Sequence, residues 1–352
     1  MKRFVRTALM AFVVAACIVP AGVFAQADLQ PVAIVKLAKT EPITVRQYRS
    51  ELAKMEAQAK RALTGEEKRQ VLDLMIDERL VLQAAERDRV AVTDNEVNQQ
   101  VQQMRMMMSQ QLGRELTQKE FETALKNEAG IDYATYKEGI KKQLIAQKYL
   151  MSKKRADFEA MKPPSAEEIQ SAFELNQTKL VRPHTVKASM ILVQPDGSAD
   201  GQKKARDLAD KLAAEIGKDP TVFDQVALRS RTPNAGYQAD TGAIVPRIPE
   251  VHDMFGSTFV TKLFALRIDE VSTVVETPRG FIIAKPIEIY GQKMLTLDDP
   301  YQPGARATVR EYLGNQLLQK KQAAVLEKAT RDLMDELRKG TPYQIFEKNL
   351  SL

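Results

Sequence analysis

Histidine and cysteine, which zinc sites and many nucleophilic sites require, are scarce in this sequence. Among its 352 residues there are two histidines, His184 and His252, and one cysteine, Cys17. The sequence has no HExxH, CxxC, G-x-S-x-G, Walker or GxGxxG motif. A zinc site or a Ser-His-Asp triad would have to be assembled from scattered residues, so we expect no metal, no cofactor and no such triad.

Long hydrophobic runs are also missing, apart from one near the start of the chain. Three basic residues among the first six precede the apolar run ALMAFVVAACIVPAGVFA, which Pro20 and Gly22 make too short and too broken for a membrane span. A basic start, a short apolar middle and small residues at the end are typical of a secretory signal peptide. We therefore predict that residues 1–25 are removed after Ala25, which implies export.

The same segment contains a competing processing site. The sequence VAAC, which ends at Cys17, resembles a lipoprotein processing box. Lipidation at Cys17 is the alternative to cleavage after Ala25 and would attach the chain to a membrane; an uncleaved anchor is the third possibility. Cleavage after Ala25 would remove Cys17 and leave a chain without disulfides or thiolate chemistry, whose stability depends on packing alone.

The excess of positive charge is small. Removing the three basic residues of the signal segment lowers the formal net charge from +6 to +3. The remaining basic residues are spread along predicted helices together with acidic ones. This distribution favours solubility over a nucleic-acid-binding surface, so we expect no nucleic acid partner.

Helical signals dominate the first half of the chain, after a short predicted strand at residues 31–39. Apolar residues recur every three or four positions from Val45 onward. Four Ser/Thr-x-x-Glu patterns predict helix starts, and they begin at Thr64, Thr93, Thr117 and Ser165. We predict a helical domain over residues 26–180.

The second half has a different pattern. The strand-like segments HTVKASMILV, VSTVVE and GFIIAKPIE, with two predicted helices, indicate an α/β module over residues 181–290. A long helix is then predicted from about residue 305 to 339, within a final segment of residues 291–352. Its apolar positions need a partner, which we expect to be the N-terminal helical domain; they are Val309, Tyr312, Leu317, Leu326, Leu333 and Leu337. The predicted fold class is α+β, with the α/β module inserted into a mostly helical domain.

One helical stretch, VNQQVQQMRMMMSQQL, is rich in methionine. Its predicted inward stripe consists of Val97, Val101, Met104 and Met108, so these two methionines are interpreted as core. Met106 and Met107 lie off the stripe. Methionine is flexible and polarizable and is common on surfaces that accept many partners, so both are candidate binding residues; the alternative is that they pack against another helix.

The module from Val181 to Ile289 resembles the parvulin peptidyl-prolyl isomerase domain. The likeness lies in ASMILV as the first strand, FDQVAL as a helix, ADTGAI where the family has a Gly-Asp-Leu-Gly turn, and FVTKLFALRIDEVSTVVETPRGFIIAK as the closing helix and strands. The earlier segment RQVLDLMIDERLVLQAAERDRVAVTDNEV and the last helix resemble the chaperone portion of SurA/PrsA-type exported foldases. The resemblance covers nearly all of the chain after residue 25 and rests on the order of the parts.

The resemblance implies where a catalytic site should lie. The parvulin pattern places one histidine in the first strand and another in the last, and here these positions hold Met190 and Ile282. The family's cysteine or aspartate falls near Thr232, where SRTPN supplies neither. His184 is about 20 Å along an extended strand from Met190, whereas His252 lies in a predicted loop that could approach the site.

Three phenylalanines fall where the family keeps an apolar proline pocket. They are Phe255, Phe259 and Phe264. We interpret Phe255 and Phe259 as lining an exposed cleft for substrate, and Phe264 as more typical of core. The implied site thus retains an apolar pocket beside a lost histidine pair.

The resemblance implies a periplasmic chaperone that binds unfolded or nascent envelope proteins, including proline-containing segments, and whose parvulin domain is a weak catalyst. Rotation about a prolyl bond needs no nucleophile, so loss of the histidines reduces catalysis more than it abolishes it. One alternative is an active peptidyl-prolyl isomerase that uses the apolar pocket and another polar group. The other is a structural adaptor of the cell envelope whose domains only pack against partners.

Processing gives the first test. We expect the mature chain to begin at Gln26, because Ala25 ends the apolar run with small residues around it. Intact-mass measurement of the protein purified from the cell envelope should give the mass of residues 26–352. A diacylglycerol on Cys17 would contradict the prediction.

Overall fold

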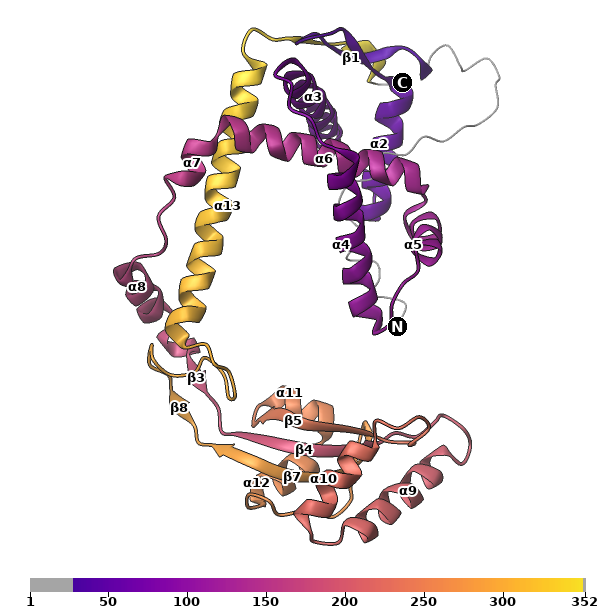
Figure 1. The fold of residues 1–352 in the computed structure, drawn as a ribbon, viewed down its shortest axis with the longest axis vertical. Coiled ribbons are helices and arrows are strands. Elements are labelled where there is room, and N and C mark those ends of the chain that lie inside the picture. Colours follow the sequence, from indigo (N-terminus) through magenta and orange to yellow (C-terminus); the bar gives the residue numbers. More distant parts are fainter. Residues whose placement is uncertain (1–27, 351–352) are drawn as a thin grey trace. The chain divides into compact units, whose positions relative to one another are not determined.

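The computed structural model describes residues 28–350, which fall into two compact units (Figure 1). Unit 1 contains the described residues up to Lys162 and those from Lys321 onward, and unit 2 is the intervening segment Pro163–Lys320. The predicted α+β class is confirmed, since unit 1 is mostly helical and unit 2 contains a four-stranded sheet. The predicted signal peptide and Cys17 lie outside the described residues.

Unit 1 combines a small antiparallel sheet with several helices. Its elements in chain order are β1 (Pro31–Val35), β2 (Glu41–Thr44), α2 (Val45–Ala59), α3 (Gly65–Arg87), α4 (Asp94–Leu112), α5 (Gln118–Ala124), a π-helical turn (Leu125–Ala129), α6 (Tyr133–Lys153), α7 (Arg155–Glu159), the end of α13 (Val309–Arg338), β9 (Tyr343–Ile345) and a 3-10 turn (Glu347–Asn349). The strand order is β2-β1-β9, so a strand near the end of the chain pairs with one near its start.

Capping boxes start helices of unit 1 where the sequence predicts them. Thr64, Thr93 and Thr117 each accept a hydrogen bond from the backbone N–H three residues later, and the glutamate at that position accepts one from the cap residue in return. Thr44 forms a further capping box with Gln47, which the Ser/Thr-x-x-Glu pattern does not include because the fourth residue is glutamine. Each box satisfies backbone donors that a helix start otherwise leaves unpaired.

The core of unit 1 joins the two ends of the chain. Leu333 and Leu337, near the end of α13, are buried in one cluster with Val35 of β1 and Leu72 of α3. The last turns of α13 therefore bury their apolar side chains against the first strand and an early helix of the chain.

Two polar contacts accompany this packing. Arg338 donates from Nε to an Asp77 carboxylate oxygen at 2.7 Å, and burial nevertheless raises the pKa of the Asp77 carboxyl. Gln83 of α3 is 1% exposed, and its Oε1 accepts hydrogen bonds from the three backbone N–H groups of residues 37–39 at 3.0–3.4 Å. One buried side-chain amide thus accepts hydrogen bonds from the backbone N–H groups of the turn between β1 and β2 and links this turn to α3.

Unit 2 is built on an antiparallel sheet of order β5-β4-β7-β6 (Figure 1). Its elements are α8 (Ala166–Asn176), a 3-10 turn (Gln177–Lys179), β3 (Val181–Arg182), β4 (Thr185–Val193), α9 (Gly201–Ile216), α10 (Pro220–Arg229), β5 (Gln238–Pro246), α11 (Pro249–Phe255), α12 (Ser257–Ala265), β6 (Val275–Thr277), β7 (Gly280–Tyr290), β8 (Lys293–Met294) and the start of α13. Side chains of α9 and α10 pack on one face of the sheet, and those of α11 and α12 pack on the other.

Packing divides the chain at different residues from the predicted domains. Helix α8 belongs to unit 2, because its Ile169 packs with Leu297 and Val309. The first boundary therefore falls after residue 162 rather than residue 180. The second falls within α13, after residue 320, rather than at residue 290.

The apolar stripe predicted along the last helix is only partly correct. One end of α13 buries Leu313 in unit 2, and the other end buries Leu333 in unit 1. Tyr312 and Leu326 are 37% and 49% exposed, so neither belongs to a core. A helix whose two ends belong to different cores needs no continuous stripe. Within residues 28–350, no helix is long and apolar enough to cross a membrane.

The contribution of α13 to unit 1 can be measured with two matched substitutions. Leu333→Ala should lower the free energy of unfolding of unit 1 by about 2–5 kcal/mol, because it leaves a cavity among buried side chains. Leu326→Ala, on an exposed part of the same helix, should change it by less than about 0.5 kcal/mol. Hydrogen exchange of the α3 amides reports unit 1 alone, and equal effects of the two substitutions would contradict the prediction.

Candidate functional site

One face of the unit 2 sheet is apolar across its central strands. The strands pair Met190 with Ala284 and Leu192 with Ile282, and all four side chains belong to one apolar cluster. Met190 and Ile282 are therefore diagonal neighbours on the same face. Ile282 is 1% exposed, whereas Met190 is partly exposed. The structure thus brings together the two positions that the resemblance assigned to histidines, and both are apolar.

Helices α11 and α12 cover part of this face with aromatic side chains. The ring centroids of Phe255 and Phe259 lie 5.4 Å apart. Phe259 is 1% exposed, so the interpretation of Phe259 as an exposed cleft residue is wrong. It packs in the same cluster as Val260 and Leu263, on the side of α12 that faces the sheet. Phe255 is only partly buried and remains the candidate aromatic contact for a bound chain.

Phe264 is partly buried and packs against the same apolar cluster as Phe259. Its ring lies edge-to-face with the His184 ring at a centroid distance of 4.9 Å, and the Arg247 guanidinium carbon lies 5.5 Å from its centroid. His184 is thus held in an aromatic contact with Phe264.

The other histidine lies close to the aromatic pair. His252 Nδ1 is 3.3 Å from the Ser257 hydroxyl oxygen, and Phe255 lies between them in sequence. Thr232, near which the family has a cysteine or aspartate, is exposed and donates its hydroxyl to the Arg229 carbonyl at 2.8 Å. Among residues 28–350, no group of three His, Cys, Asp or Glu side chains is placed to bind a metal.

A buried lysine on the opposite face of the sheet was not predicted. Lys285 is 5% exposed and donates from Nζ to both carboxylate oxygens of Asp224, at 2.7 and 2.8 Å. Its ammonium also lies 5.6 Å from the Phe223 ring centroid. Strand alternation puts Lys285 on the face opposite to Ala284, so this ion pair fastens α10 to the sheet and does not enter the apolar site. The only signal in the sequence was a lysine that directly follows the apolar run FIIA.

The second candidate surface lies near the end of α4 in unit 1. Met106 and Met107 are 56% and 50% exposed, and Leu112 on the same helix is 44% exposed. Met108 is buried and Met104 packs against the same core, as the predicted inward stripe requires. The exposed methionines are therefore available at the surface of unit 1.

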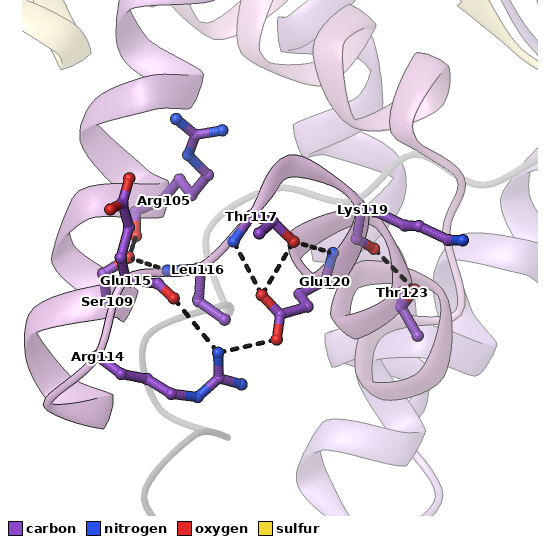
Figure 2. Close-up of polar contacts among 9 residues, drawn as sticks. All are labelled: Arg105, Ser109, Arg114, Glu115, Leu116, Thr117, Lys119, Glu120 and Thr123. Carbon is purple, nitrogen blue, oxygen red and sulfur yellow. Dashed lines mark hydrogen bonds and ion pairs between the residues drawn. The ribbon is translucent and has the colours of Figure 1, made fainter.

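The connection between α4 and α5 holds this end of α4 in place (Figure 2). The Ser109 hydroxyl donates to the Arg105 carbonyl and accepts from the Leu116 backbone N–H, both at 2.9 Å. Arg114 donates at 2.8 Å to Glu120, the same carboxylate that closes the capping box of α5. Met106 and Met107 thus lie on a helix whose end is fixed by hydrogen bonds.

Comparison with known proteins agrees with this architecture. Residues 1–150 match the family model of the SurA-like N-terminal domain, and residues 164–299 match that of the PPIC-type PPIase domain. The foldase protein PrsA of Clostridium botulinum is 27% identical over 310 residues, which are 86% of this chain and 80% of that protein. The chain belongs to the SurA/PrsA-type foldases.

Further relatives are more distant. Chaperone SurA of Pseudomonas aeruginosa is 26% identical to this foldase over 235 residues, which are 65% of this chain and 52% of that one. The solved structure of a SurA-like chaperone from Campylobacter jejuni covers 90% of this chain and 99% of its own, with 14% identity and a TM-score of 0.38. The match to the PPIC-type domain begins at residue 164, and unit 2 begins at Pro163, so the two boundaries agree.

The exposure of the two methionines predicts how the foldase tolerates their replacement. The double substitution Met106→Gln and Met107→Gln should change the free energy of unfolding by less than about 1 kcal/mol, because both side chains are at the surface. Met108→Gln is the matched control. It should cost about 2 kcal/mol or more, because it buries an amide among apolar side chains. Urea unfolding followed by circular dichroism measures both, and a large loss in the double variant would contradict the surface assignment.

Proposed function

We propose that this foldase is an exported chaperone that binds unfolded or proline-containing segments of other proteins and is itself a weak isomerase. The observation that carries the proposal is the apolar pair Met190 and Ile282 on one face of the parvulin sheet. Neither side chain can donate or accept a proton or form a strong hydrogen bond. The site is therefore suited to hold an apolar or prolyl side chain more than to polarise its amide.

Weak catalysis is compatible with such a site. Rotation about a peptide bond has a barrier of about 18–20 kcal/mol and passes through a twisted amide. A shaped apolar surface can favour that twisted form to some extent by binding it better than the planar ground state. Hydrogen bonds from polar side chains would add to this preference, and at positions 190 and 282 they are missing. We infer that catalysis is slow while binding is retained.

Unit 1 supports a role in holding clients. Met106, Met107 and Leu112 place exposed apolar atoms on one helix, and methionine adapts its shape to different partners. Because the hydrogen bonds at the end of α4 fix the backbone, binding there would not require the helix to be ordered first. We propose that this surface contacts unfolded segments without sequence specificity.

The location of the clients follows from the predicted leader. A signal peptide at residues 1–25 would export the chain, so we propose the periplasm as its location and unfolded or nascent envelope proteins as its partners. Membrane attachment would come only from lipidation at Cys17.

A second candidate function is an active isomerase. The observation that favours it is the pair His252 and Ser257, whose side chains lie 3.3 Å apart at either side of partly exposed Phe255. These polar groups could supply a hydrogen bond to a prolyl amide bound against Phe255. His252→Ala would then remove most of the isomerase activity. If the protein is mainly a chaperone, as proposed, its isomerase activity is already low and the substitution changes it little.

Restoring the two histidines tests the main proposal. Met190→His combined with Ile282→His should raise the rate of prolyl isomerisation on short X-Pro peptides by at least tenfold, while either single change does little. The double variant should also lose about 2–4 kcal/mol of stability, because an imidazole replaces a buried isoleucine. Exchange-spectroscopy measurement of cis–trans rates gives the activity.

The control for polarity alone is Met190→Gln with Ile282→Asn, which should lower stability without raising the rate. Suppression of aggregation of an unfolded client, measured beside the isomerase assay, tests the holding function. Strong isomerase activity of the unmodified protein that is indifferent to Phe255→Ala would overturn the proposal.

A further inference from the structure

An exposed cation lies at the edge of the candidate site in unit 2. We name this edge the Arg279 corner and define it by Met254 and Phe255 at the end of α11 and by Pro278 and Arg279 in the turn between β6 and β7. Met254 is 47% exposed, and Pro278 and Arg279 are exposed as well. The corner thus combines apolar atoms with a guanidinium at the surface.

The turn that carries Arg279 has a fixed backbone. The Thr277 hydroxyl donates to the Gly280 carbonyl at 2.7 Å and accepts from the Arg279 backbone N–H at 3.2 Å. Gly280 has φ +124°, and a Cβ there would lie 2.3 Å from the Val193 carbonyl oxygen, so only glycine fits. This close approach and the two hydrogen bonds set the position from which the Arg279 side chain extends.

The side chain of Arg279 is oriented by contacts with α11. Its guanidinium carbon lies 5.8 Å from the Phe255 ring centroid, and its Nη1 lies 3.7 Å from the Met254 sulfur. A cation over an aromatic face is weakly favourable at an exposed site. No carboxylate within residues 28–350 forms an ion pair with Arg279. The positive charge therefore stands beside the partly exposed ring of Phe255 without a direct ion-pair partner among the described residues.

The exposed cation defines the kind of chain that fits the corner. In an extended segment, side chains two residues apart lie on the same side and about 6–7 Å from each other. The guanidinium carbon and the Phe255 ring centroid are 5.8 Å apart, which is close to this spacing. A segment with an apolar or prolyl residue against Phe255 would place the side chain two positions away next to Arg279, where a carboxylate is favoured and an ammonium is disfavoured.

We propose that Arg279 is a specificity-determining residue, which makes the parvulin domain prefer extended client segments that carry an acidic side chain two residues from the bound apolar or prolyl residue. The inference rests on the proposed function, because it assumes that Phe255 contacts the client. It adds a charge preference to a site whose two sheet positions, Met190 and Ile282, are apolar.

Matched peptides and charge-altering variants of the full-length protein test the inference. The peptides are identical except for one position and contain Glu-Ala-Pro, Gln-Ala-Pro or Lys-Ala-Pro, and fluorescence anisotropy gives their dissociation constants. The unmodified protein should bind the Glu peptide about two- to fivefold more tightly than the Gln peptide, as expected for an exposed ion pair. The Lys peptide should bind most weakly, and raising the salt concentration should remove these differences.

The variants separate charge recognition from packing. Arg279→Lys should keep the preference for Glu, Arg279→Gln should lose it, and Arg279→Glu should prefer the Lys peptide. Arg306→Gln, which removes an exposed arginine elsewhere in unit 2, is the matched control and should behave as the unmodified protein. If the role of Arg279 were purely structural, its substitution would weaken the binding of all three peptides equally and would not reverse the order of their affinities.

The outcomes distinguish the inference from the proposed function. If the unmodified protein binds the three peptides equally well, the role of Arg279 is overturned while client binding stands. If it binds none of them and also fails to suppress aggregation, the proposed function itself is overturned.

Discussion

The alternation of side chains along β4 and β7 is the constraint on which unit 2 depends. It places Met190 and Ile282 on one face and the ion pair of Lys285 with Asp224 on the other. A shift of β7 by one residue would bring the charged Lys285 among apolar side chains and take Ile282 out of its cluster. The register that packs the core therefore also determines that the candidate site is apolar.

Each unit contains an ion pair that is at least partly buried, and the two pairs differ in their surroundings. In unit 2 the one buried charge that packing encloses, Lys285, is paired with Asp224 through two short hydrogen bonds. In unit 1 the pair of Arg338 with Asp77 is accompanied by a raised pKa of the Asp77 carboxyl, because desolvation outweighs the attraction of the guanidinium. The last turns of α13 are thus held in unit 1 by the buried side chains of Leu333 and Leu337 and by a partly buried ion pair.

Much of the helical part could be predicted from the sequence, because helix starts and buried stripes depend on residues close together in the chain. The capping boxes at Thr64, Thr93, Thr117 and Ser165 form as the pattern predicts. The apolar positions of the parvulin sheet were also predictable, since the burial of Ile191 and Val193 opposite Met190 follows from a period of two.

The features that sequence reasoning missed depend on contacts between distant residues. The sequence of β5, QADTGAIVP, has little apolar alternation and so does not look like a strand. Its pairing with β4 also contains a register shift opposite Ala188–Met190. Phe259 was expected at the surface because of its polar neighbours, but the direction of its side chain is set by how α12 lies on the sheet. The three backbone N–H groups bound by Gln83 likewise become neighbours only when the hairpin packs on α3.

The pairing of β1 with β9 has a consequence for the order in which the chain folds as it emerges. Unit 1 cannot complete its sheet or its core until residues 333–345 are available, although most of its helices come first. All four strands of the unit 2 sheet lie between residues 185 and 290, so that sheet needs nothing from the end of the chain. When the chain emerges with its N-terminal end first, the middle of the sequence can therefore reach its native packing before the beginning does.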